Sequence, residues 1–269
     1  TGPQGPTGEC CEEPAFAYVT NQNNDTISIV DLNTNMIIPP TITGFSVPSS
    51  IAISTDGSKA YVTNYGAGTV SIVDLNNNMI IPPTITGFSF PSSIAISTDG
   101  SKAYVTSYTA DTVSIVDLNN NMIIPPTITG FSGPGGIAIS TDGSKAYVTN
   151  SRNHTVSIVD LNNNVIIPPT ITGFSVPSGI AISTDGSKAY VTNLVFGTVS
   201  IVDLNNNMII PPTITGFSSP GPIAISTDGS KAYVTNQGTY TVSIVDLNTN
   251  MIIPPTITGF TYPSGIAIK

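Results

Sequence analysis

The sequence predicts an all-β protein, a six-bladed β-propeller in which each blade has four antiparallel strands. A Tyr-Val-Thr triplet recurs at a constant step of 43 residues, beginning at Tyr18, Tyr61, Tyr104, Tyr147, Tyr190 and Tyr233. Asp-Leu-Asn triplets keep the same step, beginning at Asp31, Asp74, Asp117, Asp160, Asp203 and Asp246. No insertion or deletion separates two copies. A period of this length, filled with short β-rich runs, is typical of one propeller blade.

One copy shows the four expected strands, at residues 50–54, 59–64, 69–75 and 79–88. Asp56-Gly57 is a hairpin turn signal between the first two strands, and the Asn run 76–78 forms a polar turn between the last two. Pro82 and Pro83 cannot donate to a strand ladder, so the fourth strand belongs at an edge, the outer rim of the blade. The small Ile-Ala-Ile strand is then expected to line the central channel.

The two ends of the repeat region complement each other. The segment that begins at Pro14 supplies a second strand with no first strand before it, whereas Ile266, Ala267 and Ile268 form a first strand with no second strand after it. We therefore expect one blade to be built from both ends, which closes the ring non-covalently. The predicted domains are an arm, residues 1–13, and a propeller, residues 14–269.

The repeated words "AYVTN…TVSIVDL" and "GIAIS.DG.KAYVTN" resemble the YVTN-repeat β-propellers of microbial surface proteins, and the resemblance covers residues 14–269. It implies the propeller fold and an extracellular location, on a cell or spore surface. Families of this kind rarely have an assigned biochemical activity, so the resemblance implies little about function. The chain contains no Trp, so the WD dipeptide of the WD40 propellers is absent.

The arm differs from the rest of the chain. Gly2, Gly5 and Gly8 keep a Gly-X-Y register with Pro3 and Pro6 at X positions, which resembles the end of a bacterial collagen-like stalk. Three triplets alone would not hold a triple helix, so a longer stalk would have to precede them. The alternative is a plain Pro/Gly linker.

Cys10 and Cys11 are the only cysteines, so the propeller offers neither a partner. Adjacent cysteines rarely pair with each other, and stable disulfides would therefore join arms of different chains. The pair resembles the interchain knot of fibrillar collagens, which implies an oxidising extracellular setting and self-association, as a trimer or alternatively as a filament. The alternatives are a pair of free thiols or, with less support, metal binding.

Composition excludes several classes of partner. Only 9% of residues are charged and the net charge is −9, with one Arg and six Lys, so a nucleic acid is not an expected partner. No apolar run approaches the 18 or so residues that a membrane span requires.

Differences between the copies gather in two windows. One is the loop after the Tyr-Val-Thr strand, and the other is the residue before the proline that precedes the first strand. Because strands alternate in direction, both windows are expected on one face of the propeller, where loops on a rigid scaffold usually bind partners. The expected site for a glycan or protein ligand comprises Tyr65, Phe90, Tyr108, Arg152, His154, Phe196, Tyr240 and Tyr262. The alternative is drift in loops that tolerate change.

The sequence indicates no catalytic machinery, no cofactor and no metal site. His154 is the only His and has no acidic neighbour, and the repeated Asp56 and Asp74 fit turn chemistry better than calcium binding. We therefore expect a non-enzymatic, extracellular structural or adhesive protein, the head or repeating body of a surface fibre or appendage. The alternative is a free-standing binding module that uses the variable loops.

Overall fold

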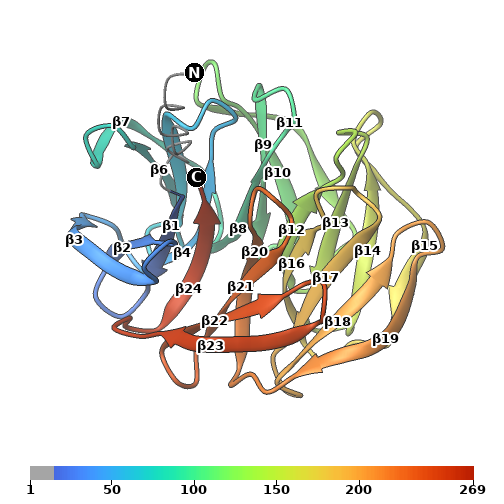
Figure 1. Ribbon diagram of the computed structural model, residues 1–269. Helices are drawn as coiled ribbons and strands as arrows, with labels where there is room; N and C mark the ends of the chain where they lie inside the picture. The colour runs from blue at the N-terminus through green and yellow to red at the C-terminus, as the bar shows by residue number, and fades with distance from the viewer. Residues whose placement is uncertain (1–14) are drawn as a thin grey trace, which may run out of the picture.

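The computed structural model describes residues 15–269 as 24 strands in six four-stranded antiparallel sheets, arranged as blades around a central axis (Figure 1). This confirms the predicted six-bladed propeller. Residues 1–14, which include the predicted arm with Cys10 and Cys11, lie outside the described part. Within the described part, no helix is long and apolar enough to cross a membrane.

The first and second strands of each blade surround the axis. The innermost strands are β4 (Pro48–Ile53), β8 (Pro91–Ile96), β12 (Pro134–Ile139), β16 (Pro177–Ile182), β20 (Pro220–Ile225) and β24 (Pro263–Ile268). The second strands are β1 (Phe16–Asn21), β5 (Lys59–Asn64), β9 (Lys102–Ser107), β13 (Lys145–Asn150), β17 (Lys188–Asn193) and β21 (Lys231–Asn236). Each innermost strand begins at its proline, before the predicted start (at Pro48 in place of residue 50 in β4), and proline is tolerated as the first residue of a strand.

The third and fourth strands complete each blade outward. The third strands are β2 (Thr26–Asp31), β6 (Thr69–Asp74), β10 (Thr112–Asp117), β14 (Thr155–Asp160), β18 (Thr198–Asp203) and β22 (Thr241–Asp246). The outer strands are β3 (Met36–Thr43), β7 (Met79–Thr86), β11 (Met122–Thr129), β15 (Val165–Thr172), β19 (Met208–Thr215) and β23 (Met251–Ile257). We number as blade 1 the sheet β24-β1-β2-β3, and as blades 2 to 6 the sheets that follow it along the chain.

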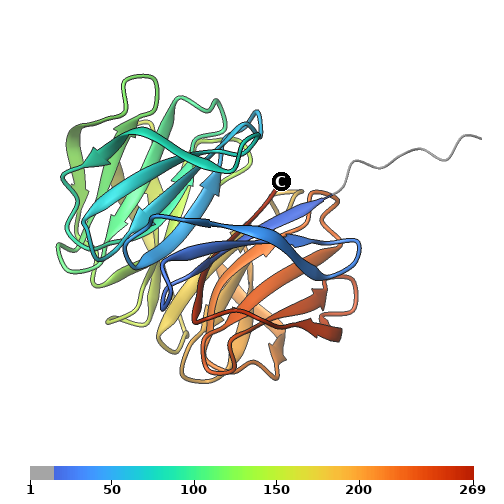
Figure 2. The ribbon, with the colours of Figure 1, turned by 90° about the vertical axis from the view of Figure 1, so that its left-hand side faces the viewer.

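The ring closes as predicted. β24 pairs antiparallel with β1, with Ile266 opposite Val19, Ala267 opposite Tyr18 and Ile268 opposite Ala17. The red end of the chain therefore lies beside the blue beginning in Figures 1 and 2. Backbone hydrogen bonds between Phe16 and Lys269, in both directions, continue the pairing to the last residue.

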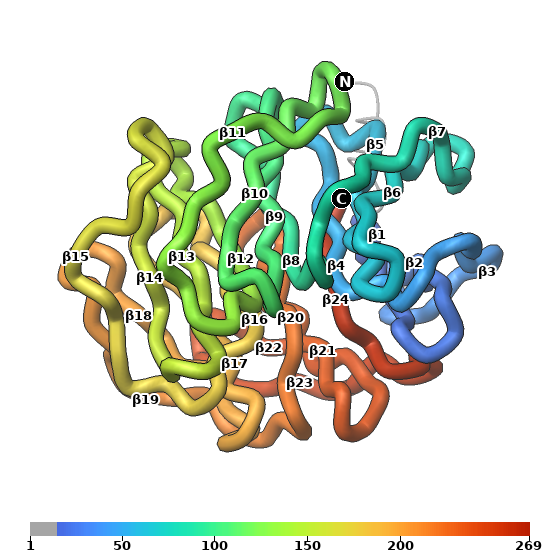
Figure 3. The backbone as a smooth tube through the Cα atoms, turned by 180° about the vertical axis from the view of Figure 1, so that it is seen from behind, coloured from blue at the N-terminus to red at the C-terminus, as the bar shows by residue number. Residues whose placement is uncertain are grey.

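The Pro-Pro pairs lie on the fourth strand of each blade, as their missing N–H groups require, and Figure 3 shows these strands, such as β15 and β19, at the outside of the ring. In blade 1 the β2–β3 register shifts between Ile27 and Ile29, so that Pro39 and Pro40 fall in the irregular part of the ladder. Both prolines are exposed. The same pattern recurs in the other blades, and it interrupts the edge on which another strand could otherwise pair.

The hydrophobic core is divided into six layers, one between each pair of neighbouring blades. Between blades 1 and 2, for example, Tyr18, Ile27 and Ile29 pack against Val62 and Val73. Each repeated tyrosine of the Tyr-Val-Thr triplet lies in such a layer, and desolvation by burial raises the pKa of its phenol. The layer between blades 6 and 1 contains Ile266 of β24, so ring closure completes the core.

Candidate functional site: the mouth of the central channel

The two variable windows share one face of the propeller, which we call the variable face. It comprises loops 22–25, 65–68, 108–111, 151–154, 194–197 and 237–240 with the connections that lead into the innermost strands. The first residue of each loop donates its backbone N–H to the carbonyl of the preceding connection: Tyr65 to Val47 at 3.0 Å and Tyr108 to Phe90 at 3.3 Å, for example. These bonds fix the position of the first residue of each loop.

A buried asparagine holds each loop from below in five of the blades. The Asn64 carbonyl oxygen accepts the N–H of Ser46 at 3.1 Å, and its amide nitrogen donates to Ser71 at 2.8 Å. Equivalent bonds from Asn150 reach Ser132 and Ser157. The loops therefore differ in sequence but rest on the same framework, so their side chains project from fixed positions.

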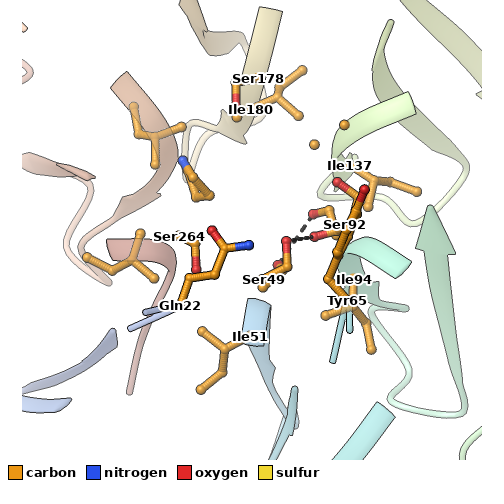
Figure 4. Close-up of a pocket in the computed structure, with 18 of the residues that line it drawn as sticks. Gln22, Ser49, Ile51, Tyr65, Ser92, Ile94, Ile137, Ser178, Ile180 and Ser264 are labelled. Atoms are coloured by element: carbon orange, nitrogen blue, oxygen red, sulfur yellow. Dashed lines mark hydrogen bonds between the residues drawn. The ribbon is translucent and has the colours of Figure 1, made fainter. Parts of the chain in front are cut away.

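The mouth of the channel on the variable face is a cavity of about 410 Å³. Its rim consists of the side chains of Gln22, Tyr65, Tyr108, Gln237 and Tyr262. Below the rim, the cavity is lined by residues at the second and third positions of the innermost strands, which are Ser, Gly or Pro. Below them lies one isoleucine from each blade: Ile51, Ile94, Ile137, Ile180, Ile223 and Ile266. Figure 4 shows the Gln22 amide pointing toward the middle of the cavity, between Ser49 and Ser264.

Each of the three rim tyrosines contacts a neighbour that does not itself line the cavity. The Tyr65 ring packs against Phe90, with 5.1 Å between the ring centroids. The guanidinium carbon of Arg152 lies 4.7 Å from the centre of the Tyr108 ring, a cation–π contact. Tyr262 packs against Tyr240 at 6.1 Å. The tyrosine rings are therefore supported by Phe90, Arg152 and Tyr240.

Arg152 is held in turn by Asp111. Its Nη1 donates to Asp111 Oδ1 at 2.9 Å, and its Nη2 donates to the backbone carbonyl of Tyr108 at 3.3 Å. Both members of the ion pair are more than two-fifths exposed, so solvent screens their attraction and the pair orients the guanidinium more than it stabilises the fold.

Two further predicted residues, His154 and Phe196, also lie on the variable face outside the cavity. His154 has a positive φ of 59°, and its Nδ1 accepts the backbone N–H of Val176 at 2.9 Å. Asp111 occupies the equivalent place in blade 3, where its carboxylate accepts the N–H of Gly133 at 2.7 Å. His154 therefore closes a loop as Asp111 does. Phe196 is 72% exposed at the tip of the blade 5 loop.

Sequence reasoning missed the small residues of the innermost strands and the two rim glutamines. Ser49 Oγ donates to the Ser92 carbonyl of the next blade at 2.8 Å, as drawn in Figure 4, and Ser264 Oγ donates to the Pro48 carbonyl at 2.6 Å. Where blades approach more closely, glycine replaces serine: a Cβ on Gly136 would lie 2.6 Å from the Ser178 carbonyl oxygen. Position in the repeat is the signal that could have found both groups: the small residues follow the proline directly, and the glutamines are the first residues of their loops.

The opposite face, which we call the uniform face, carries the turns between first and second strands and between third and fourth strands. Asp56 Oδ1 accepts the Ser54 hydroxyl at 2.6 Å and the Ser58 N–H at 2.9 Å, and these bonds lower its pKa to about 2. The carboxylate of Asp74 accepts the N–H of Asn76 and the amide of Asn77, which also lowers its pKa. These repeated acids act in turns. Among the described residues, no His, Cys, Asp or Glu cluster could hold a metal ion.

Comparison with known proteins identifies the fold. No family model matches the chain, and no curated protein is similar to it in sequence. Solved structures with similar folds include Kuenenia stuttgartiensis hydrazine synthase (20% identity, TM-score 0.71, covering 92% of this chain and 84% of that one). Others are a functionally unknown protein from Desulfotomaculum acetoxidans DSM 771 (19%, 0.71, 94% and 98%) and a chain of a nidogen/laminin complex (15%, 0.81, 94% and 98%). At these identities the likeness shows the β-propeller fold alone.

Proposed function

We propose that this protein is a non-enzymatic adhesive and structural component of an extracellular cell or spore surface, and that it binds a glycan or protein ligand through the variable face. The observation that carries the proposal is the channel mouth, where three tyrosines converge and each ring contacts a supporting neighbour. Rigid aromatic side chains that are also able to form hydrogen bonds are common at recognition surfaces, because ordering them costs little entropy.

Binding without catalysis agrees with the chemistry of the cavity. No charged side chain lines it, so a general acid or base would have to come from elsewhere. His154 lies outside the cavity, and its Nδ1 already accepts a backbone hydrogen bond. The residues that vary between the blades therefore offer contact surfaces and hydrogen-bonding groups, which are what a binding site needs.

The position at which β1 begins favours a tethered head. β1 starts at Phe16 beside Asp31, where the uniform face begins, and the variable face lies at the other end of the same strand. Ala15, which precedes β1, therefore lies on the face opposite the channel mouth. Attachment through residues 1–13 would leave the recognition site free, which suits the head of an appendage.

Assembly through the arm is the second part of the proposal. The Gly-X-Y register and the Cys10–Cys11 pair suit collagen-like association of three arms by interchain disulfides, and the YVTN-like repeats suit a microbial surface. In gel electrophoresis without reductant we expect a covalent trimer that falls to 27.8 kDa chains on reduction. The Cys10→Ser/Cys11→Ser variant should run as a monomer with the propeller folded. A ladder of larger species would indicate a filament instead, and a monomeric wild type with two titratable thiols would exclude assembly through these cysteines.

An adhesion assay tests whether the variable face binds a ligand. Fluorescently labelled protein is incubated with intact cells or spores of its source, and the bound fraction is measured. The triple variant Tyr65→Ser/Tyr108→Ser/Tyr262→Ser should lose binding at least tenfold, while Met79→Ser, an exposed residue of the outer strand β7, should bind as wild type does. Equal binding by the triple variant would favour drift of the loops over recognition.

A further inference from the structure

We propose that the ligand of the channel mouth is a neutral saccharide, namely the exposed end of a glycan chain. This inference rests on the proposed function and makes it more specific. The cavity volume of about 410 Å³ lies within the range of small-molecule sites. Its lining is uncharged, and it combines aromatic rings, amides and hydroxyl groups.

The rim offers hydrogen-bonding groups without partners of their own. Within residues 15–269, the Tyr65 and Tyr108 hydroxyls and the Gln22 amide make no hydrogen bond to another residue, although the Tyr262 hydroxyl lies 3.4 Å from Gln237 Oε1. A tyrosine hydroxyl both donates and accepts, and a glutamine amide donates through nitrogen and accepts through oxygen. Sugar hydroxyls also do both, so the rim can pair with several of them at once.

The tyrosine rings supply the second element of saccharide recognition, a flat apolar surface for the C–H face of a pyranose ring. Two of these surfaces are fixed before any ligand arrives, because Phe90 packs against Tyr65 and Arg152 packs against Tyr108. Side chains that are already ordered lose little further entropy on binding. A sugar ring would stack less favourably on tyrosine rings that lacked such supporting neighbours.

The charges exclude other ligand classes. Phosphate and carboxylate ligands are usually met by Arg or Lys, but no charged residue lines the cavity, and Arg152 beside it is paired with Asp111. The net charge of −9 also disfavours acidic glycans and nucleotides. A cationic peptide would find no carboxylate in the lining. A neutral ligand with many hydroxyl groups fits what remains.

The shape favours the end of a glycan over its middle. The innermost strands converge below the rim so closely that a Cβ on Gly136 or Gly179 would meet the backbone of the next blade. The cavity is therefore bounded on its sides by the six innermost strands, and the buried isoleucines lie deepest in it. A terminal sugar can enter from above while the rest of the chain continues over the loops.

The test uses the full-length protein with four named probes: cellotriose, mannotriose, chitotriose and, as the acidic comparison, trigalacturonate. Saturation-transfer NMR detects contact, and calorimetric titration gives the affinity. We expect at least one neutral trisaccharide to bind and trigalacturonate to bind at least tenfold more weakly. Tyr65→Ser and Tyr108→Ser should each weaken binding at least tenfold and Arg152→Ala about two- to fivefold, whereas Met79→Ser, an exposed residue of the outer strand β7, should not weaken it at all. Tyr65→Phe, which keeps the ring, should retain most of the affinity.

Three results would overturn the inference. The first is that no neutral probe binds at a concentration of about 10 mM, which would place every Kd above the millimolar range. The others are that trigalacturonate binds best, or that the tyrosine variants bind as wild type does. The adhesion assay separates these results from failure of the proposed function. If the triple tyrosine variant loses adhesion but no saccharide binds or competes, the recognition face stands and its ligand is a protein. If adhesion is also unchanged, the proposed function fails as well.

Discussion

Ring closure by β24 makes Ile266 as important to stability as its counterparts in covalently continuous blades. Ile266 is 7% exposed and lies in the layer between blades 6 and 1 with Val19 and Tyr233. Ile51 is the equivalent residue of blade 2, where the turn that contains Asp56 and Gly57 links the first strand to the second, and it is 4% exposed. The pair Ile266→Ala and Ile51→Ala is therefore a matched test of the closure.

The expected loss follows from the buried volume that each substitution removes. Deleting three buried carbons costs about 2.4 kcal/mol in transfer free energy, at about 0.8 kcal/mol per carbon. The cavity left between two rigid sheets adds to that cost, so each variant should lose about 2–5 kcal/mol of the free energy of unfolding. Because the closed ring unfolds as one unit in this account, the two losses should agree within about 1 kcal/mol.

The assay is denaturant unfolding followed by far-ultraviolet circular dichroism, with thermal unfolding as a second measurement. A loss of 2–5 kcal/mol corresponds to a fall in Tm of about 4–20 °C for a chain of this size. Deleting residues 266–269 should cost more, because it also removes backbone pairing with β1. An unchanged midpoint for Ile266→Ala, with Ile51→Ala destabilised, would show that β24 does not close the ring.

Three further predictions concern the loops, the turns and the channel. His154→Asp should keep the stability of the wild type, because Asp111 makes the same bond in blade 3, whereas His154→Ala should cost about 0.5–1.5 kcal/mol for the lost hydrogen bond in chemical unfolding. The pKa of Asp56 is about 2 in the folded protein, below its ordinary value of 3.8, so its stabilising contribution is present above about pH 4 and is lost as the pH falls toward 2. The Tm should therefore fall mainly in that window, and a decline that begins near pH 6 would contradict this. Gly136→Ala should cost about 1–3 kcal/mol, because the new Cβ meets the Ser178 carbonyl oxygen; an unchanged midpoint would show that the strands can separate.

The sequence predicted the fold well because six copies without insertions repeat the same signals. Three signals each allow one physical interpretation, and the structure agrees with all of them: the Asp-Gly turns, the prolines of the outer strands and the complementary ends. The one clear error was the start of the innermost strands. The sequence places the proline ahead of the first strand, but Pro48 is the first paired residue, opposite Asn64.

That error has a functional consequence, because Ser49 and the residues equivalent to it line the channel mouth. The sequence also could not divide the predicted aromatic residues into those that line the cavity and those that support them. Tyr65 and Phe90 look alike in sequence, yet only Tyr65 faces the cavity, since the distinction depends on how loops of neighbouring blades meet. Gln22 and Gln237 occupy the same position of the repeat as Tyr65 and Tyr108, the first residue of the variable loop, but a choice based on aromatic and charged side chains leaves them out.

The most direct test of the central claim, recognition at the channel mouth, is a tyrosine footprint of the bound protein. The protein is nitrated with tetranitromethane when free and when attached to the surface that it recognises, and modification of each tyrosine is measured by mass spectrometry. Tyr65 and Tyr108 should lose at least half of their reactivity on attachment, while Tyr240, which is 46% exposed and outside the cavity, should lose less. Equal modification of Tyr65 and Tyr108 in the free and attached protein would contradict the account.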